Sequence, residues 1–126
     1  KYLSVGDELL NLTYNEVQSV ADAGFFLSRY EPFGYTPLEA ASYLSLAFTT
    51  DHAGFGAYLT KMRLENQGIY VEKLIGKTRD QIINQIANDM LKVVLLDPDD
   101  LFKLRINARK TVENFDWNSL FNNYSQ

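Results

Sequence analysis

The stretch that decides the fold runs from Arg29 to Ala40 and reads RYEPFGYTPLEA. It follows a short apolar run, FFLS at residues 25–28, and leads into a segment with helical apolar spacing, which predicts a strand–turn–helix junction. Two carboxylates, Glu31 and Glu39, stand eight positions apart in it. At such a junction the strand end opens onto a crevice, and the helix N-terminus presents N–H groups that favour an anion. The stretch therefore predicts a site for an anionic ligand.

Segments on either side of this junction alternate between strand and helix patterns. Strands are expected at residues 25–28, 47–50 and 68–71, and the first has the continuous apolar pattern of a strand buried on both faces. Strands that alternate with helices indicate parallel βα units, so we expect an α/β fold. The expected helices begin at Thr13, at Thr36, near residue 57, at Thr78, at Asp97 and at Asp116.

Capping signals mark several of these helix starts. The pairs Thr13–Glu16 and Thr78–Gln81 have the spacing of a capping box. Thr36 and Glu39 have the same spacing, and Pro37 would then occupy the first helical position, where a missing N–H costs nothing. Taken by itself, this spacing gives Glu39 a simple role as an acceptor for an N–H group of its own helix.

Composition limits the class of protein. The 126 residues are 46% apolar and 13% aromatic, which suits one packed domain. A net charge of -4 disfavours nucleic acid or an anionic membrane as the main partner. The chain has no cysteine and no apolar run long enough to span a membrane, which suits a cytoplasmic protein. Because Lys1 is not an initiator methionine, we expect the chain to be a piece of a longer protein.

Four stretches of the chain resemble motifs of one enzyme family, and they occur in the same order as in that family. Residues 31–40 resemble the E-x7-E motif of retaining GT-B glycosyltransferases, and their Gly-Tyr-Thr-Pro form is most similar to glycogen synthases of the animal and fungal type and their bacterial relatives. TYNE at 13–16, TTDHAGFG at 49–56 and DWNSL at 116–120 resemble further motifs of the same family. The resemblance implies a Rossmann-like, three-layer parallel sheet with flanking helices. Residues 1–126 would form a single domain, the latter part of the C-terminal nucleotide-sugar-binding domain, with the N-terminal domain absent.

The resemblance also implies roles for individual residues. Glu31 would be the catalytic residue near the donor sugar, and Glu39 would bind the ribose. The other implied substrate-binding residues are Tyr14, which would stack on the nucleotide base, and Phe33, Gly34, Tyr35 and Thr36, in the turn whose backbone amides would contact the diphosphate. Simpler interpretations stand beside these: Glu31 as a solvated carboxylate, Tyr14 as a half-buried aromatic, and His52 as an exposed loop residue.

The implied reaction is transfer of glucose from UDP-glucose or ADP-glucose to an α-1,4-glucan with retention, with no metal and no cofactor. The missing N-terminal domain would complete the site, so the piece alone would be inactive, and its exposed apolar surface could produce a homo-oligomer. Two alternatives remain: a GT-B glycosyltransferase that makes another glycoconjugate, and a non-catalytic nucleotide-sugar-binding module.

One short stretch departs from the family pattern. Where the family usually has G-[IV]-P after the motif helix, this chain has Leu44, Ser45 and Leu46. We therefore expect the turn that leads from this helix into the next strand to differ in geometry from that of the family.

Overall fold

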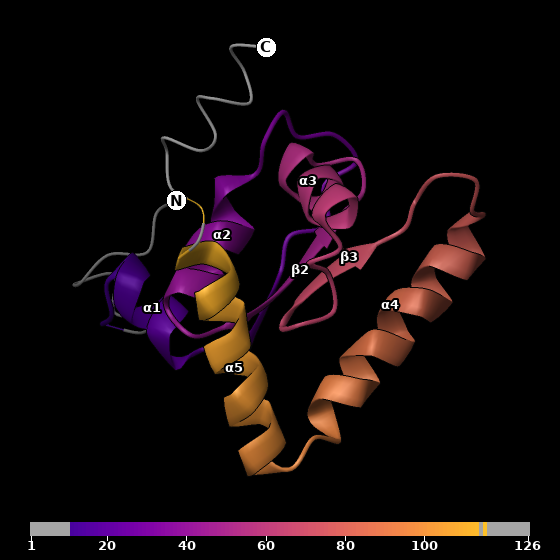
Figure 1. The fold of residues 1–126 in the computed structure, drawn as a ribbon. Helices are drawn as coiled ribbons and strands as arrows, with labels where there is room; N and C mark the ends of the chain where they lie inside the picture. Colours follow the sequence, from indigo (N-terminus) through magenta and orange to yellow (C-terminus); the bar gives the residue numbers. More distant parts are fainter. Residues whose placement is uncertain (1–10, 114, 116–126) are drawn as a thin grey trace.

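The structure is a computed structural model that describes residues 11–113 and 115. Figure 1 shows an α/β arrangement in which a short parallel sheet, in the order β1-β2-β3, is flanked by helices. The expected α/β class and parallel sheet are confirmed, whereas the helix expected from Asp116 and the DWNSL stretch lie outside the described residues. The elements are α1 (Tyr14–Val20), β1 (Ala23–Phe25), α2 (Tyr35–Ser42), β2 (Leu46–Thr50), α3 (Gly54–Met62), β3 (Ile69–Glu72), α4 (Arg79–Val94) and α5 (Pro98–Glu113).

One face of the sheet carries the hydrophobic core. Side chains alternate between the two faces of a strand, so Ala47 of β2 and its register partner Ile69 of β3 point the same way. They pack with Ala41 of α2, Phe55 of α3 and Ala108 of α5, all of which are buried. The three helices α2, α3 and α5 therefore cover this face.

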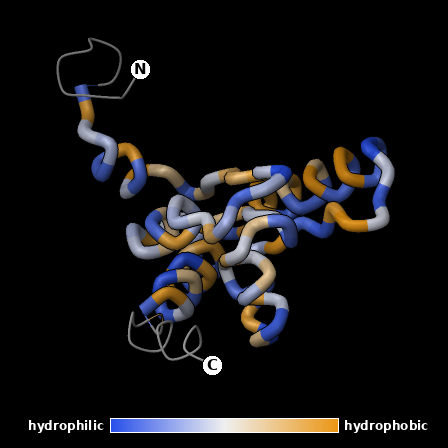
Figure 2. Tube along the Cα trace, turned by 90° about the horizontal axis from the view of Figure 1, so that it is seen from above, coloured by the Kyte–Doolittle hydropathy of each residue, from blue (hydrophilic) through white to orange (hydrophobic). Residues whose placement is uncertain are grey.

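The opposite face carries a row of aromatic rings across all three strands. Phe25, Phe48 and Tyr70 are register partners, and their ring centroids are 4.4 Å and 4.8 Å apart in stacked pairs. Helix α4 lies on this face beside β3, where its Gln85 side chain donates a hydrogen bond to Glu72. Figure 2, seen from above, shows α4 set apart from the other helices.

The first strand differs from its expected position. It covers Ala23–Phe25, earlier than the expected 25–28, and Phe25 is 37% exposed, so the expectation of a strand buried on both faces is wrong. Among the described strands β1 pairs only with β2, and an edge strand lacks the second neighbour that would cover it. Burial along the whole strand is instead found in the central β2, all of whose residues are buried.

Three predicted helix starts, at Thr13, Thr78 and Asp97, are confirmed. The capping boxes at Thr13–Glu16 and Thr78–Gln81 are both present, and α5 begins after Asp97, whose Oδ1 accepts hydrogen bonds from the N–H groups of Asp99 and Asp100. Local capping interactions of this kind need no distant partner, which is why the sequence predicts them well.

The turn after α2 keeps a glycine-like geometry with a leucine in it. Leu44 has φ 63°, in the left-handed region. The N–H of Leu44 donates to Ala41 O at 3.1 Å and the N–H of Ser45 to Ala40 O at 3.0 Å, which is the Schellman pattern of a helix end. The Leu44 carbonyl in turn accepts a hydrogen bond from Arg105 Nε on α5. The stretch that departs from the family pattern therefore ends the helix in a Schellman turn and places a Cβ where glycine is favoured.

This strained position gives a direct test. Leu44→Gly should be more stable to denaturant unfolding than Leu44→Ala by about 1 kcal/mol, because both lose the leucine side chain and only glycine adopts this φ without a Cβ clash. Ser42→Gly and Ser42→Ala, in the ordered helix two residues earlier, should show the opposite order. Equal stability of the two Leu44 variants would mean that the position is not strained.

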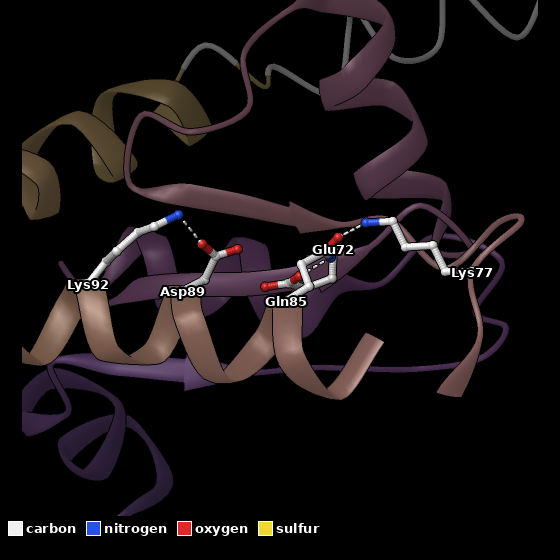
Figure 3. A network of polar contacts seen from close by, with 5 residues as sticks. All are labelled: Glu72, Lys77, Gln85, Asp89 and Lys92. Atoms are coloured by element: carbon white, nitrogen blue, oxygen red, sulfur yellow. Dashed lines mark hydrogen bonds and ion pairs between the residues drawn. The ribbon is translucent and has the colours of Figure 1, made fainter. Parts of the chain in front are cut away.

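A polar network holds α4 on the sheet (Figure 3). The Glu72 side chain, at the end of β3, is buried and accepts a hydrogen bond from Gln85 Nε2, while Gln85 Oε1 accepts one from Lys77. Lys92 pairs with Asp89 at 2.6 Å on the same helix. Burial raises the pKa of the Glu72 carboxyl; the Gln85 hydrogen bond opposes this rise and the Asp89 charge adds to it. Glu72 therefore binds a proton more readily in the folded chain than in the unfolded one.

This shift predicts a pH dependence of stability. Since the folded pKa of Glu72 is raised above 4.5, its effect favours the folded state at low pH and is lost as the pH rises from 4.5 through the folded pKa. Glu72→Gln should remove this loss, so the free energy of unfolding should fall less between pH 5 and pH 8 than in the parent chain. Asp80→Asn, an exposed carboxylate change on the same helix, should leave that slope unchanged. Identical slopes for the parent and Glu72→Gln would contradict the assignment.

Candidate functional site

The loop that carries Glu31 is paired with the loop that follows β2. Glu31 and Ala53 form a parallel β-bridge, and the Gly54 N–H donates to Glu31 O at 3.1 Å. The Phe55 N–H donates to Phe33 O at 2.6 Å, and the Glu31 N–H to His52 O at 3.4 Å. These bonds prolong the parallel order beyond the ends of β1 and β2, so Glu31 lies at the carboxyl edge of the sheet.

Glycine is required at two positions in the first turn of α3. A Cβ on Gly54 would lie 2.2 Å from the backbone oxygen of Pro32, and one on Gly56 would lie 2.1 Å from the backbone oxygen of Thr50. Both distances are far below contact distance, and the clashing atoms belong to the backbone. Gly54 therefore lets the Glu31 loop approach the start of α3, and Gly56 lets the first turn of α3 pack against the end of β2.

The Glu31 carboxylate is held between a hydroxyl and a glycine. Ser28 Oγ donates a hydrogen bond to Glu31 Oε2 at 3.2 Å. A Cβ built on Gly34 would lie 3.3 Å from the same oxygen, so the carboxylate rests against the Gly34 backbone. Thr50 Oγ1 donates to Ser28 O at 2.7 Å and so holds Ser28 to β2. The sequence interpretation missed Ser28, although the Ser-x-x-Glu spacing is a usable signal for a hydroxyl that contacts the carboxylate.

The start of α2 differs from its expected position. The N-cap is Gly34, with φ 93° and ψ 75°, and no side chain caps the helix. Thr36 and Pro37 are thus the second and third helical residues, and the predicted capping box between Thr36 and Glu39 is wrong. The positive φ of Gly34 turns the chain directly into the helix, so the turn itself replaces a side-chain cap. The backbone N–H groups of Tyr35 and Thr36 lie in the first turn, where a helix has no acceptors of its own.

Glu39 instead meets Tyr14 from another helix. The Tyr14 hydroxyl donates to Glu39 Oε2 at 3.4 Å, and Gln18 Nε2 donates to the Tyr14 hydroxyl at 2.9 Å. Tyr14 is 44% exposed, so its ring is available at the surface rather than enclosed in the core. The structure thus brings together two predicted substrate-binding residues that stand 25 positions apart.

The aromatic residues of the junction divide into two groups. Phe33 packs against the core, with its ring 6.0 Å from that of Phe55 and 4.7 Å from that of Tyr35. Tyr35 is 48% exposed at the start of α2. His52 is exposed, as one interpretation of the sequence has it, and its Nδ1 lies 2.8 Å from Arg29 O. Since a carbonyl only accepts, Nδ1 carries the proton in this contact.

The described residues contain no group of three or more histidine, aspartate or glutamate side chains that could hold a metal ion. Over the same residues, none of the helices combines the length and the apolar character that a membrane span needs. The described residues of the junction offer carboxylates, hydroxyls, an exposed aromatic ring and the backbone amides at the start of α2.

The contact between the two loops generates a test. Helix propensity alone predicts that Gly54→Ala stabilises α3 by up to about 1 kcal/mol. We expect the opposite, a loss of more than about 1 kcal/mol, because the new Cβ meets the Pro32 backbone oxygen. Thermal or urea unfolding measures this difference. Ala57→Gly, an exposed position in the same helix, serves as a control for propensity, and a Gly54→Ala variant as stable as the parent would refute the close approach.

Comparisons with known proteins identify the family of the chain. A family model described as glycogen synthase matches residues 1–126. Glycogen [starch] synthase isoform 1 of Saccharomyces cerevisiae is 32% identical over 117 residues, which are 90% of this chain and 16% of the relative. The glycogen [starch] synthase of Neurospora crassa is 29% identical over 120 residues, 93% of this chain and 17% of the relative. The human liver glycogen [starch] synthase is 32% identical over 89 residues, 69% of this chain and 13% of the relative. The chain thus spans less than a fifth of each of these relatives, and it belongs to the glycogen synthase family.

Proposed function

We propose that this chain is the donor-binding portion of a glucosyltransferase that transfers glucose from UDP-glucose or ADP-glucose to an α-1,4-glucan with retention of configuration. The observation that carries the proposal is the contact between Tyr14 and Glu39. Glu39 does not cap its own helix, and its carboxylate lies beside the exposed aromatic ring of Tyr14. This pair of groups suits a nucleoside, because a base can stack on the ring and the ribose hydroxyls can donate hydrogen bonds to the carboxylate.

The diphosphate of the donor would lie at the start of α2. The turn at Gly34 presents the first-turn amides of Tyr35 and Thr36 at a helix N-terminus, where the helix dipole favours negative charge. Departure of the nucleoside diphosphate increases negative charge on its leaving oxygen in the transition state. Donors fixed in advance by the fold stabilise this charge without reorganisation.

Glu31 would act at the sugar. Ser28 and the Gly34 backbone fix its carboxylate, and the backbone bonds of its loop fix the main chain. A carboxylate held in this way can orient sugar hydroxyls and stabilise the positive charge that develops on the sugar ring. In this proposal Glu31 acts through orientation and charge.

A preceding N-terminal domain would supply the other wall of the cleft. The free side of β1 within the described sheet offers a strand edge to which a further strand of the same sheet would pair, and Phe25 at that edge is partly exposed. The isolated piece is therefore expected to be inactive, with the intact protein acting in the cytoplasm on a nucleotide sugar and an α-glucan.

The test uses the full-length protein with separate readouts for binding and chemistry. Glu39→Ala should weaken binding of the nucleoside diphosphate, measured by calorimetry, by roughly tenfold, because the ribose loses its acceptor. Glu31→Gln should leave that affinity nearly unchanged and lower kcat for glucosyl transfer by roughly 100-fold or more. Glu113→Gln, an exposed change on α5, should affect neither quantity.

The outcomes separate the alternatives. Nucleotide affinity that does not change in Glu39→Ala would refute the assignment of the ribose site. Tight nucleotide binding by a parent protein that transfers no sugar would indicate a non-catalytic module. Transfer to an acceptor other than an α-glucan, identified by product analysis, would indicate a glycosyltransferase for another glycoconjugate with the same donor site.

A further inference from the structure

A cavity lies at the carboxyl edge of the sheet, on the face covered by α4. Its cavity, with a volume of about 550 Å³, is bordered by residues that follow all three strands: Leu27 after β1, His52 after β2 and Leu74 after β3. The first half of α4 forms the remaining wall. This volume lies within the range of sites that hold small molecules.

Positive charge is concentrated around this cavity. Arg29, Lys77 and Arg79 all line it, although the chain as a whole carries a net charge of -4. Lys77 is hydrogen-bonded to Gln85, whereas Arg29 and Arg79 form no ion pair with the residues that the structure describes. Like charges that share one concave surface repel one another, and an anion among them would relieve the repulsion.

Nearby carboxylates are already engaged. Asp51 Oδ1, at the end of β2, accepts the Leu74 N–H at 2.9 Å. Glu72 is buried beneath α4 and hydrogen-bonded to Gln85. Neither carboxylate lines the cavity, so the charge presented there is positive.

The helical wall of the cavity is apolar. Ile82, Ile83 and Ile86 line it from α4, and Ile83 is 51% exposed. A small inorganic anion would leave this wall in contact with water. A ligand that carries both an anionic group and an apolar ring would cover it and gain the free energy of apolar burial.

We propose that this cavity binds an organic phosphomonoester, with its phosphate among Arg29, Lys77 and Arg79 and its apolar part on the isoleucines of α4. The site shares no residue with the Tyr14–Glu39 pair, so it would accept its ligand whether or not the proposed donor site is correct. The Glu31 loop lies between the two sites: His52 Nδ1 donates to Arg29 O at 2.8 Å, and the Glu31 N–H donates to His52 O at 3.4 Å.

Phenyl phosphate is the probe, because it carries a dianionic group and an apolar ring but no ribose that could bind Glu39. Calorimetry on the full-length protein should show that it binds roughly tenfold or more tightly than inorganic phosphate, since only the ester covers the isoleucine wall. Phenol, which has the ring without the charge, should bind more weakly than the ester.

Two variants and their controls assign the binding to this cavity. The double change Arg29→Gln and Arg79→Gln should weaken phenyl phosphate binding by roughly tenfold or more, because it removes two charge-assisted contacts. Ile83→Asn should weaken the ester and leave the affinity for inorganic phosphate unchanged. Lys61→Gln, which removes an exposed positive charge on α3, and Glu39→Ala should alter neither affinity, and circular dichroism should confirm that every variant is folded.

The proposal fails if phenyl phosphate does not bind, or if folded Arg29→Gln, Arg79→Gln protein binds it as well as the parent. Equal affinities for inorganic phosphate and the ester would overturn the apolar part of the assignment. Loss of nucleotide binding in Glu39→Ala with phenyl phosphate binding intact would show that the two sites are separate.

Discussion

The backbone pairing between the Glu31 loop and the start of α3 is the constraint on which the candidate site depends. Parallel strands normally diverge into separate loops at their carboxyl ends, but here the Glu31–Ala53 bridge continues the pairing. The approach is possible only because Gly54 has no side chain to meet the Pro32 oxygen. With the loop fixed, the Glu31 carboxylate is held against the Gly34 backbone and α2 begins at a defined point beside it. A glycine in one loop therefore determines where a carboxylate of another loop can lie.

Both ends of α2 are set by left-handed residues, and α5 links them to the rest of the chain. Gly34 starts the helix and Leu44 follows its end, each with a positive φ. Arg105 of α5 donates to the Leu44 carbonyl and pairs with Asp22 at 3.0 Å, just before β1. The same side chain thus ties the end of α2 to the segment after α1, the two helices that carry Glu39 and Tyr14. The proposed nucleoside contact, far from α5 in the sequence, depends on this packing.

The two faces of the sheet are stabilised in different ways. One is closed by apolar side chains from α2, α3 and α5, and the other by stacked rings and the network of Glu72 with α4. A polar attachment through Gln85 and Lys77 holds α4 beside β3 and leaves the cavity between its first half and the strand ends. The cavity and the candidate donor site lie at the same edge of the sheet because both use the loops after parallel strands.

The sequence by itself determined the features that depend on neighbouring residues. It predicted the alternation of strands and helices, the capping boxes at Thr13 and Thr78, and a strand–turn–helix junction with Glu31 and Glu39. Only the tertiary structure decided that β1 is a short edge strand, that Gly34 rather than Thr36 starts α2, that Tyr14 meets Glu39, and that Leu44 takes a left-handed conformation. The physical reason is range. A capping box is completed within four residues. The exposure of a strand, the point where α2 starts and a contact across 25 positions depend instead on which distant segments the fold brings together.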